Sequence, residues 1–174
     1  VVMFLDSDNT LRTKSTDGTV KTVGADASGA NRQGCRVFLG SDQPISVGDI
    51  PKIQFDRKTY DSDNNFDTNT HAWTCPQDGL YSVNLQAELT SGTNSDEREV
   101  IIGESQEPFP IDEGAVKSAL NTSTFDRLSV STVNQYTAGD TIAGYARNGD
   151  SNDSLNAGNF NRNCFLEVAF LGGL

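Results

Sequence analysis

Residue types that catalytic and metal sites depend on are scarce in this chain. Its 174 residues include 1 histidine, 3 cysteines, 1 tryptophan and 1 methionine. The sequence has no Gly-x-Ser-x-Gly elbow, no glycine-rich phosphate loop and no Cys-x-x-Cys pair. A Ser-His-Asp or Cys-His arrangement would depend on His71 alone, which we expect inside a strand that leads to Trp73, and the carboxylate pairs lie in polar stretches. We therefore expect no enzyme, no catalytic residues, no metal site and no cofactor.

Long apolar runs and positive charge are also lacking. No stretch approaches the ~20 apolar residues that span a bilayer, and Val1 to Leu5 is too short for the apolar segment of a signal peptide. With 13 basic against 24 acidic residues the net charge is −11, which argues against phosphate binding. We expect no membrane insertion and no nucleic-acid partner. The acidic surface suggests a halophilic source, the alternative being an ordinary acidic surface protein.

The sequence does contain the period of β-strands. From Gly79 to Leu89, apolar residues alternate strictly with polar ones, which is typical of a strand with one buried face. Turn-rich runs precede it at 61–65 and 76–79. Further strands are predicted over residues 35–39, 52–55, 99–103, 127–133, 141–147 and 164–171. Many short strands separated by turns predict an antiparallel sandwich or barrel.

A specific spacing runs through the middle of the chain. Aromatic, acidic and glycine residues recur at fixed intervals, namely Phe55, Asp61, Phe66, Trp73, Gly79 and Tyr81, and then Val83 and Leu85. This spacing resembles the signature of the complement C1q/tumour necrosis factor (TNF)-like domain, with Trp73 where the family usually has Phe. The resemblance extends from Cys35 to Leu171. It is strongest to the versions carried by surface proteins of tailed viruses, either phages or haloarchaeal viruses.

The resemblance implies an all-β, two-sheet antiparallel jelly-roll sandwich that assembles as a homotrimer. The last predicted strand agrees, because both of its alternating sets are apolar apart from Glu167. A strand covered on both faces needs a second cover, which a neighbouring subunit would supply. We therefore expect four residues to be shared between the core and the trimer interface, namely Tyr81, Val83, Phe165 and Phe170.

The three cysteines are an odd number, so at least one is unpaired or intermolecular. In the implied jelly roll, Cys35 and Cys164 begin antiparallel neighbouring strands at opposite ends, and Cys75 ends a different strand. No pair is then within the separation that a disulfide needs. We expect three buried or partly buried thiols.

The first 33 residues differ from the rest of the chain in their sequence pattern. Residues 7–13 and 16–22 repeat one pattern of hydroxyl, Asp, turn residue, Thr, aliphatic, base and Thr. With Val1 to Leu5 they predict a small meander, which buries too little apolar surface to be stable alone. The alternative is a disordered tail. We expect residues 1–33 to be an attachment segment with a flexible linker, and residues 34–174 to be the jelly-roll domain.

The acidic turn within the signature invites a calcium-loop interpretation. Its alternating side chains are Asp61, Asp63, Asn65 and Asp67. However, Phe66 stands where the loop requires glycine and Ala72 where it requires glutamate. We interpret the segment as a solvated turn.

These features favour a non-enzymatic surface protein of a virion, as a head decoration, spike or fibre tip. Its expected partners are other virion proteins, contacted through residues 1–33, and a host surface glycan or glycoprotein. Recognition is expected in a polar loop whose candidate residues are Asn148, Asp150, Asn159, Phe160 and Arg162. Alternatives are a secreted or cell-surface C1q-like recognition module, which would be extracellular, and a capsid-stabilising cement protein.

Overall fold

The computed structural model describes residues 2–5, 11–18, 20–22, 33–90, 97–104, 114–119, 125–148, 153–158 and 163–173. The chain forms two compact units, Val1–Arg32 and Gln33–Leu174. The sequence interpretation drew the boundary after residue 33 instead. Within the described ranges, no helix is long and apolar enough to cross a membrane.

The N-terminal unit is a three-stranded antiparallel meander in the order β1 (Val2–Leu5), β2 (Leu11–Lys14) and β3 (Val20–Thr22). A tight turn joins β2 to β3, where the backbone N–H of Gly18 donates to the carbonyl of Ser15 over 3.0 Å. Gly18 takes a φ of +88°, which favours glycine. The described residues of the N-terminal unit thus fold as the predicted meander.

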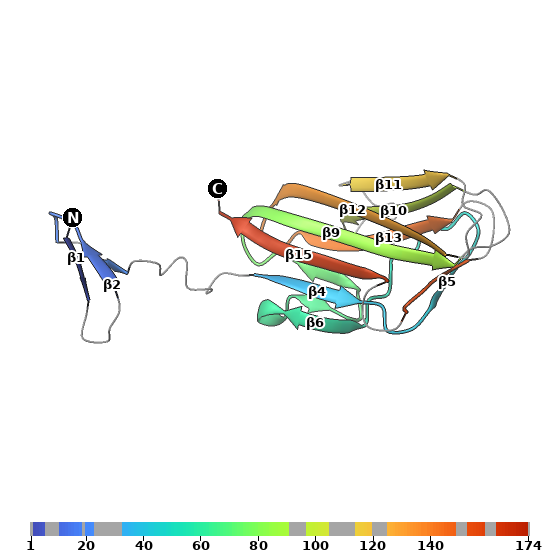
Figure 1. The fold of residues 1–174 in the computed structure, drawn as a ribbon, viewed down its shortest axis with the longest axis horizontal. Helices are drawn as coiled ribbons and strands as arrows, with labels where there is room; N and C mark the ends of the chain where they lie inside the picture. Colours follow the sequence, from blue (N-terminus) through green and yellow to red (C-terminus); the bar gives the residue numbers. More distant parts are fainter. Residues whose placement is uncertain are drawn as a thin grey trace. The chain divides into compact units, whose positions relative to one another are not determined.

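The second unit is built from two antiparallel sheets (Figure 1). The β9 sheet contains β12 (Phe125–Tyr136), β9 (Gly79–Thr90), β15 (Phe165–Gly172), β4 (Gly34–Phe38) and β6 (Arg57–Asp61), with the short β14 (Asp153–Leu155) and β5 (Gln43–Ile45). The β13 sheet has the order β11 (Gly114–Ala119), β10 (Glu97–Glu104), β13 (Thr141–Asn148), β8 (Ala72–Thr74) and β7 (Phe66–Asp67). A short 3₁₀ turn, η1 (Ser62–Asn64), joins β6 to β7.

The core lies between the two sheets and follows from the alternation in β9. One face of β9 sends five side chains inward, each at most 1% exposed: Tyr81, Val83, Leu85, Ala87 and Leu89. Trp73 from β8 is fully buried beside them, with its ring 5.3 Å from that of Tyr81. Burying one such large side chain stabilises the fold by roughly 1.5–3 kcal/mol. The sheets approach so closely that a Cβ on Gly144 would lie 2.7 Å from Leu85 Cδ1.

The acidic residue of the signature organises the turn between β6 and β7. The Asp61 carboxylate accepts hydrogen bonds from the backbone N–H groups of Asn65 and Phe66, at 3.1 Å each. It also pairs with the Lys58 ammonium at 2.7 Å. Asp61 is thus engaged in holding the turn that carries the buried Phe66.

Two sequence predictions differ from the structure. No strand forms over 52–55, where Lys52 makes only an isolated bridge to Tyr145. The chain turns there, because the Phe55 N–H donates back to the carbonyl of Ile53 over 3.0 Å. His71 was expected inside a strand, but it lies in the turn before β8 with a left-handed φ of 53°.

The sequence did not predict β6 and β11, which have 5 and 6 residues. It also missed β5, β7 and β14, whose 2 or 3 residues are too few for an alternation to be recognised. β14 falls inside the stretch 148–163 that the sequence interpretation treated as one polar loop. The long strands β4, β9, β10, β12, β13 and β15 agree with the predicted ranges.

Candidate functional site

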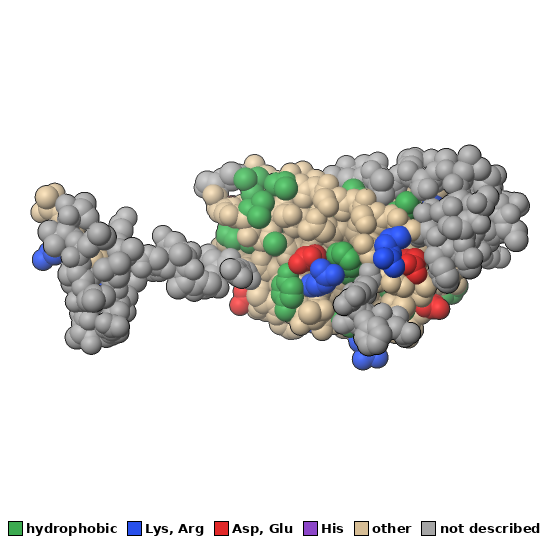
Figure 2. Space-filling view, viewed as in Figure 1, with side chains coloured by type: hydrophobic (Ala, Val, Ile, Leu, Met, Phe, Trp, Pro, Cys, Tyr) green, Lys and Arg blue, Asp and Glu red, His purple; other side chains and the backbone are tan. Residues whose placement is uncertain are grey.

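The outward face of the β9 sheet is the first candidate site. Cross-strand register places Phe165 opposite Gln86, Glu167 opposite Asn84 and Ala169 opposite Ser82, all pointing away from the core. Figure 2 views this face and shows a group of apolar, acidic and basic side chains in its middle and a separate apolar group. We call this surface the outward face.

Four side chains from three strands form the central group, which we call the Arg36 cluster. The Arg36 guanidinium donates to Glu167 Oε2 over 2.8 Å and lies 4.0 Å from the centroid of the Phe165 ring. The Tyr60 hydroxyl donates to Glu167 Oε1 over 3.2 Å. Burial, and then the charge of Glu167, raises the pKa of Tyr60 to about 12. The cluster therefore fixes long side chains on a surface, where exposed ones are usually mobile.

A second ionic group anchors one end of the same sheet. Glu88 is only 7% exposed and accepts from Arg127 Nε at 3.1 Å. Its Oε1 also accepts from the amide nitrogens of Asn156 and Asn163, at 2.7 and 2.8 Å. These contacts fix the end of β14 and the start of β15 against β9.

Apolar side chains are exposed at the opposite end of the outward face. Val133 on β12 pairs with Ser82, which also pairs with Ala169, so the three lie in one row. Val133 and Leu171 are 58% and 57% exposed, the two largest values among the exposed large apolar residues described. This row is the apolar part of the candidate surface.

The four predicted interface residues separate between the two faces. Tyr81 and Val83 are fully buried in the core. Phe170 is partly buried, with its ring 5.1 Å from that of Tyr81. Phe165 alone points outward, because it pairs with Gln86 and not with a member of the inward set. Tyr81 and Val83 are therefore core residues, and their contact with a second subunit stays a prediction.

The predicted recognition residues fall largely beyond what the structure describes. Asn148 ends β13, where its backbone pairs with Arg98. The side chain of Asn148 and the residues Asp150, Asn159, Phe160 and Arg162 lie outside the described residues. Recognition by this loop stays a prediction.

All three cysteines are free and buried. Burial raises the pKa of Cys75 and of Cys164 to about 12, and it raises the pKa of Cys35 further. Thiols in this state are poor nucleophiles at neutral pH, since the thiolate is the reactive form. In the described part of the chain, no three His, Cys, Asp or Glu side chains gather into a metal-binding group.

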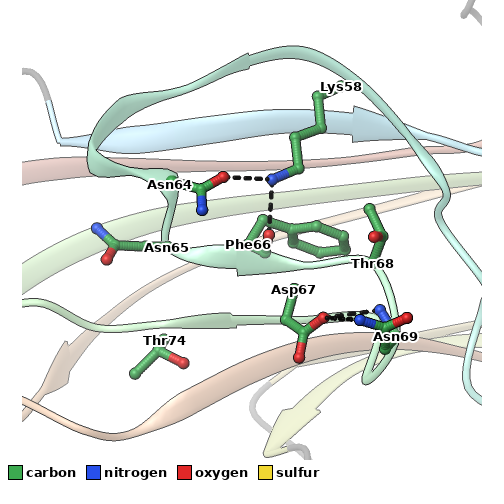
Figure 3. Close-up of a pocket in the computed structure, with 8 residues that line it drawn as sticks. All are labelled: Lys58, Asn64, Asn65, Phe66, Asp67, Thr68, Asn69 and Thr74. Carbon is green, nitrogen blue, oxygen red and sulfur yellow. Dashed lines mark hydrogen bonds between the residues drawn. The ribbon is translucent and has the colours of Figure 1, made fainter.

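A pocket of about 440 Å³ opens beside β6, η1 and β7 (Figure 3). Its lining residues are Lys58, Asn64, Asn65, Phe66, Asp67, Thr68, Asn69 and Thr74. Two of these residues, Asn65 and Asp67, belong to the acidic turn that the sequence offered as a calcium loop and that we interpreted as a solvated turn. A further signal was the density of amides and hydroxyls from Asn64 to Asn69.

Hydrogen bonds order the walls of the pocket. The Lys58 ammonium donates to Asn64 Oδ1 at 3.0 Å and to the Phe66 carbonyl at 2.7 Å. Asp67 Oδ1 accepts from the backbone N–H of Asn69 at 2.8 Å and from its side-chain amide at 3.1 Å. The backbone N–H of Asn69 is the main cause of a lowered Asp67 pKa, so this carboxylate is ionised at neutral pH.

Comparisons with known proteins define the fold. Family models and curated proteins give no match to this chain. Murine APRIL, crystallised at pH 5.0, is similar with a TM-score of 0.60 and 11% identity, covering 81% of this chain and 100% of that chain. Eiger TNF from S. frugiperda gives a TM-score of 0.57 and 11% identity, covering 83% and 95%. The chain has a TNF-like jelly-roll fold, and the predicted fold class is confirmed.

Proposed function

We propose that this protein is a non-enzymatic, homotrimeric surface protein of a tailed virus, with residues 1–33 as its attachment segment. The observation that carries the proposal is the Arg36 cluster on the outward face of a TNF-like sheet. A surface that holds Arg36, Tyr60 and Glu167 in fixed positions is prepared for a partner, since little further ordering is needed on binding.

Self-association is supported by the chemistry of the outward face. It combines an ordered ion pair with a stacked aromatic ring and the apolar row of Val133 and Ala169. Interfaces use such a mixture of aromatic, arginine and apolar contacts. The C1q/TNF-like resemblance implies a cyclic trimer, in which each outward face meets a different surface of the next subunit.

The first test measures the mass of the full chain by light scattering at micromolar concentration. We expect a trimer, and we expect Phe165→Glu on the outward face to reduce the mass towards that of a monomer. Val47→Glu is the matched control, because Val47 is 49% exposed in a turn and outside the outward face. A monomeric wild type at these concentrations contradicts the proposal.

Attachment through residues 1–33 is supported by the division of the chain into two units and by the small size of the first sheet. Deleting residues 1–33 should leave the jelly roll folded and trimeric while abolishing incorporation into particles. Unfolding of the truncated protein would show that the boundary is wrong. Loss of particle heat resistance with normal adsorption would instead favour the cement alternative.

A virion surface protein that mediates adsorption also needs a binding partner on the host cell. We propose a host surface glycan or glycoprotein as the partner, with Phe160 and Arg162 as contact residues of the polar loop. Changing both to alanine should weaken cell binding without lowering the melting temperature. A loss of stability with normal binding contradicts this assignment, and secretion without any particle association favours the extracellular C1q-like alternative.

A halophilic source is proposed from the net charge of −11. Screening of repulsion between carboxylates should raise the melting temperature from low to molar salt. A melting temperature that does not change with salt favours an ordinary acidic surface protein.

A further inference from the structure

The pocket beside β6 and β7 is lined by polar side chains on an apolar floor. It presents three amides, two hydroxyls, one carboxylate and one ammonium, while Phe66 beneath them is 1% exposed. Its volume of about 440 Å³ lies in the range of small-molecule sites. Thr74 is held firmly in its wall, because its backbone N–H donates to the Asn65 carbonyl over 2.9 Å.

The charges of the pocket are already engaged by the protein. The Lys58 ammonium has three acceptors, Asp61 Oδ2, Asn64 Oδ1 and the Phe66 carbonyl, which matches its three protons. An anionic ligand would have to displace one of them. The Asp61 carboxylate is turned to the backbone of Asn65 and Phe66, so it is not offered to a cation in the pocket.

Other hydrogen-bonding groups of the pocket remain available to a ligand. Figure 3 shows the amide nitrogen of Asn64 pointing away from Lys58 and one carboxylate oxygen of Asp67 pointing away from Asn69. Among the described residues, no hydrogen bond engages that amide nitrogen or the Thr74 hydroxyl. The Asn64 amide nitrogen, the ionised Asp67 carboxylate and the Thr74 hydroxyl line the same pocket, and such a set of donors and acceptors matches the hydroxyl groups of a sugar.

Backbone strain gathers around the same pocket. In the described part of the chain, the non-glycine residues with positive φ are Asp63 (61°), Asn64 (56°) and His71 (53°). Asn64 lines the pocket and Asp63 directly precedes it, whereas His71 lines a different pocket. Such conformations cost of order 1–3 kcal/mol each and cluster at ligand sites. The strain is independent of the lining chemistry and points to the same place.

The pocket shares no lining residue with the proposed trimer contact, although β6 carries both Lys58 of the pocket and Tyr60 of the Arg36 cluster. Its residues come from β6, η1, β7, β8 and the turns that join them, and none belongs to the apolar row. β6 lies at the other end of the β9 sheet from β12 (Figure 1). A ligand in the pocket is therefore compatible with self-association.

We propose that this pocket binds a neutral carbohydrate through Asn64, Asp67 and Thr74. It is a second recognition site, built from residues outside the polar loop at 148–163. That the sugar is the terminus of a host surface glycan rests on the proposed function, whereas sugar binding by the pocket does not.

The test is saturation-transfer NMR on the full chain with methyl glycosides of mannose, galactose, glucose and N-acetylglucosamine. We expect at least one glycoside to bind. Thr74→Val and Asp67→Asn should each weaken its affinity about tenfold, because each removes one hydrogen bond, that of Asp67 being charge-assisted. Asp49→Asn is the matched control for charge, since Asp49 is exposed in a turn away from the pocket, and it should bind as the wild type does.

Melting temperatures of all variants verify that the fold is kept. Absence of binding by all four glycosides overturns the proposal, and so does equal binding by wild type, Thr74→Val and Asp67→Asn. Binding of inorganic phosphate or calcium in place of the sugars also overturns it. None of these outcomes changes the mass or the particle incorporation by which the proposed function is judged, so the two proposals fail separately.

Discussion

The inward and outward faces of β9 and β15 differ in burial and in role, although the same strands form both. Inward, Tyr81, Val83 and Val168 are fully buried and find all their contacts within one chain. Outward, Phe165 and Glu167 remain partly exposed although they are held by neighbours. The inward face stabilises the subunit, while the outward face holds ordered side chains that are available to a binding partner. This difference teaches that order on a surface, and not apolar character alone, indicates a partner.

The largest expected effect tests the inward face. Trp73→Ala removes a fully buried ring that packs edge-on against Tyr81. We expect it to lower the free energy of unfolding by about 3–5 kcal/mol, measured by urea denaturation at fixed protein concentration. Ser131→Ala on the exposed side of β12 should change it by less than about 0.5 kcal/mol. Similar losses in both variants would erase the distinction between the faces.

The next effect concerns the turn that supports the pocket. Asp61→Ala removes the acceptor of the Asn65 and Phe66 N–H groups and the partner of Lys58. A loss of about 2–3 kcal/mol in the free energy of unfolding is expected, because hydrogen bonds to a charged group are involved. Asp49→Ala, at an exposed turn, is the control. If calcium stabilises the wild type and not Asp61→Ala, the turn is a metal site and our interpretation of it is wrong.

The sequence predicted what depends on repetition over many residues. The alternation in β9 predicted a strand with one buried face, and the spacing from Phe55 to Tyr81 predicted the fold class through its resemblance to the C1q/TNF-like signature. The sequence could not assign Phe165 to the outward side, since both alternating sets of β15 are apolar and register is decided by pairing with β9.

The pocket escaped prediction for a different reason. It is formed by hydrogen bonds between residues of a short segment whose composition equally suits a solvated turn. The left-handed conformations of Asn64 and His71 have no signature in composition, since asparagine is common in any turn and histidine in none. Only the conformation shows that Lys58 closes one wall and Thr74 another.

A smaller effect on stability is expected at the outward face. Glu167→Gln removes the ion pair with Arg36, which is about 30% exposed on both sides. Exposed pairs contribute only ~0–1 kcal/mol, so the free energy of unfolding of the subunit should hardly change. The trimer should instead dissociate at a higher protein concentration than the wild-type trimer does, as measured by light scattering. Unchanged association together with a lower free energy of unfolding would show that the Arg36 cluster stabilises the subunit and not the trimer interface.

The smallest expected effect concerns the ionisation of one group on the outward face, the Tyr60 hydroxyl. Burial, and then Glu167, raises the pKa of Tyr60 from 10.0 to about 12, so the folded state binds this proton more tightly than the unfolded state does. The resulting stabilisation is complete below pH 10 and is lost as the pH rises from 10 to about 12. The ultraviolet absorbance of the phenolate, taken as wild type minus Tyr60→Phe, should titrate near pH 12. Glu167→Gln should move this titration downwards only in part, because burial is the larger cause. A Tyr60 that titrates at its ordinary pKa in the wild type would mean that the Arg36 cluster is not ordered in solution, and the outward face would lose the feature that sets it apart.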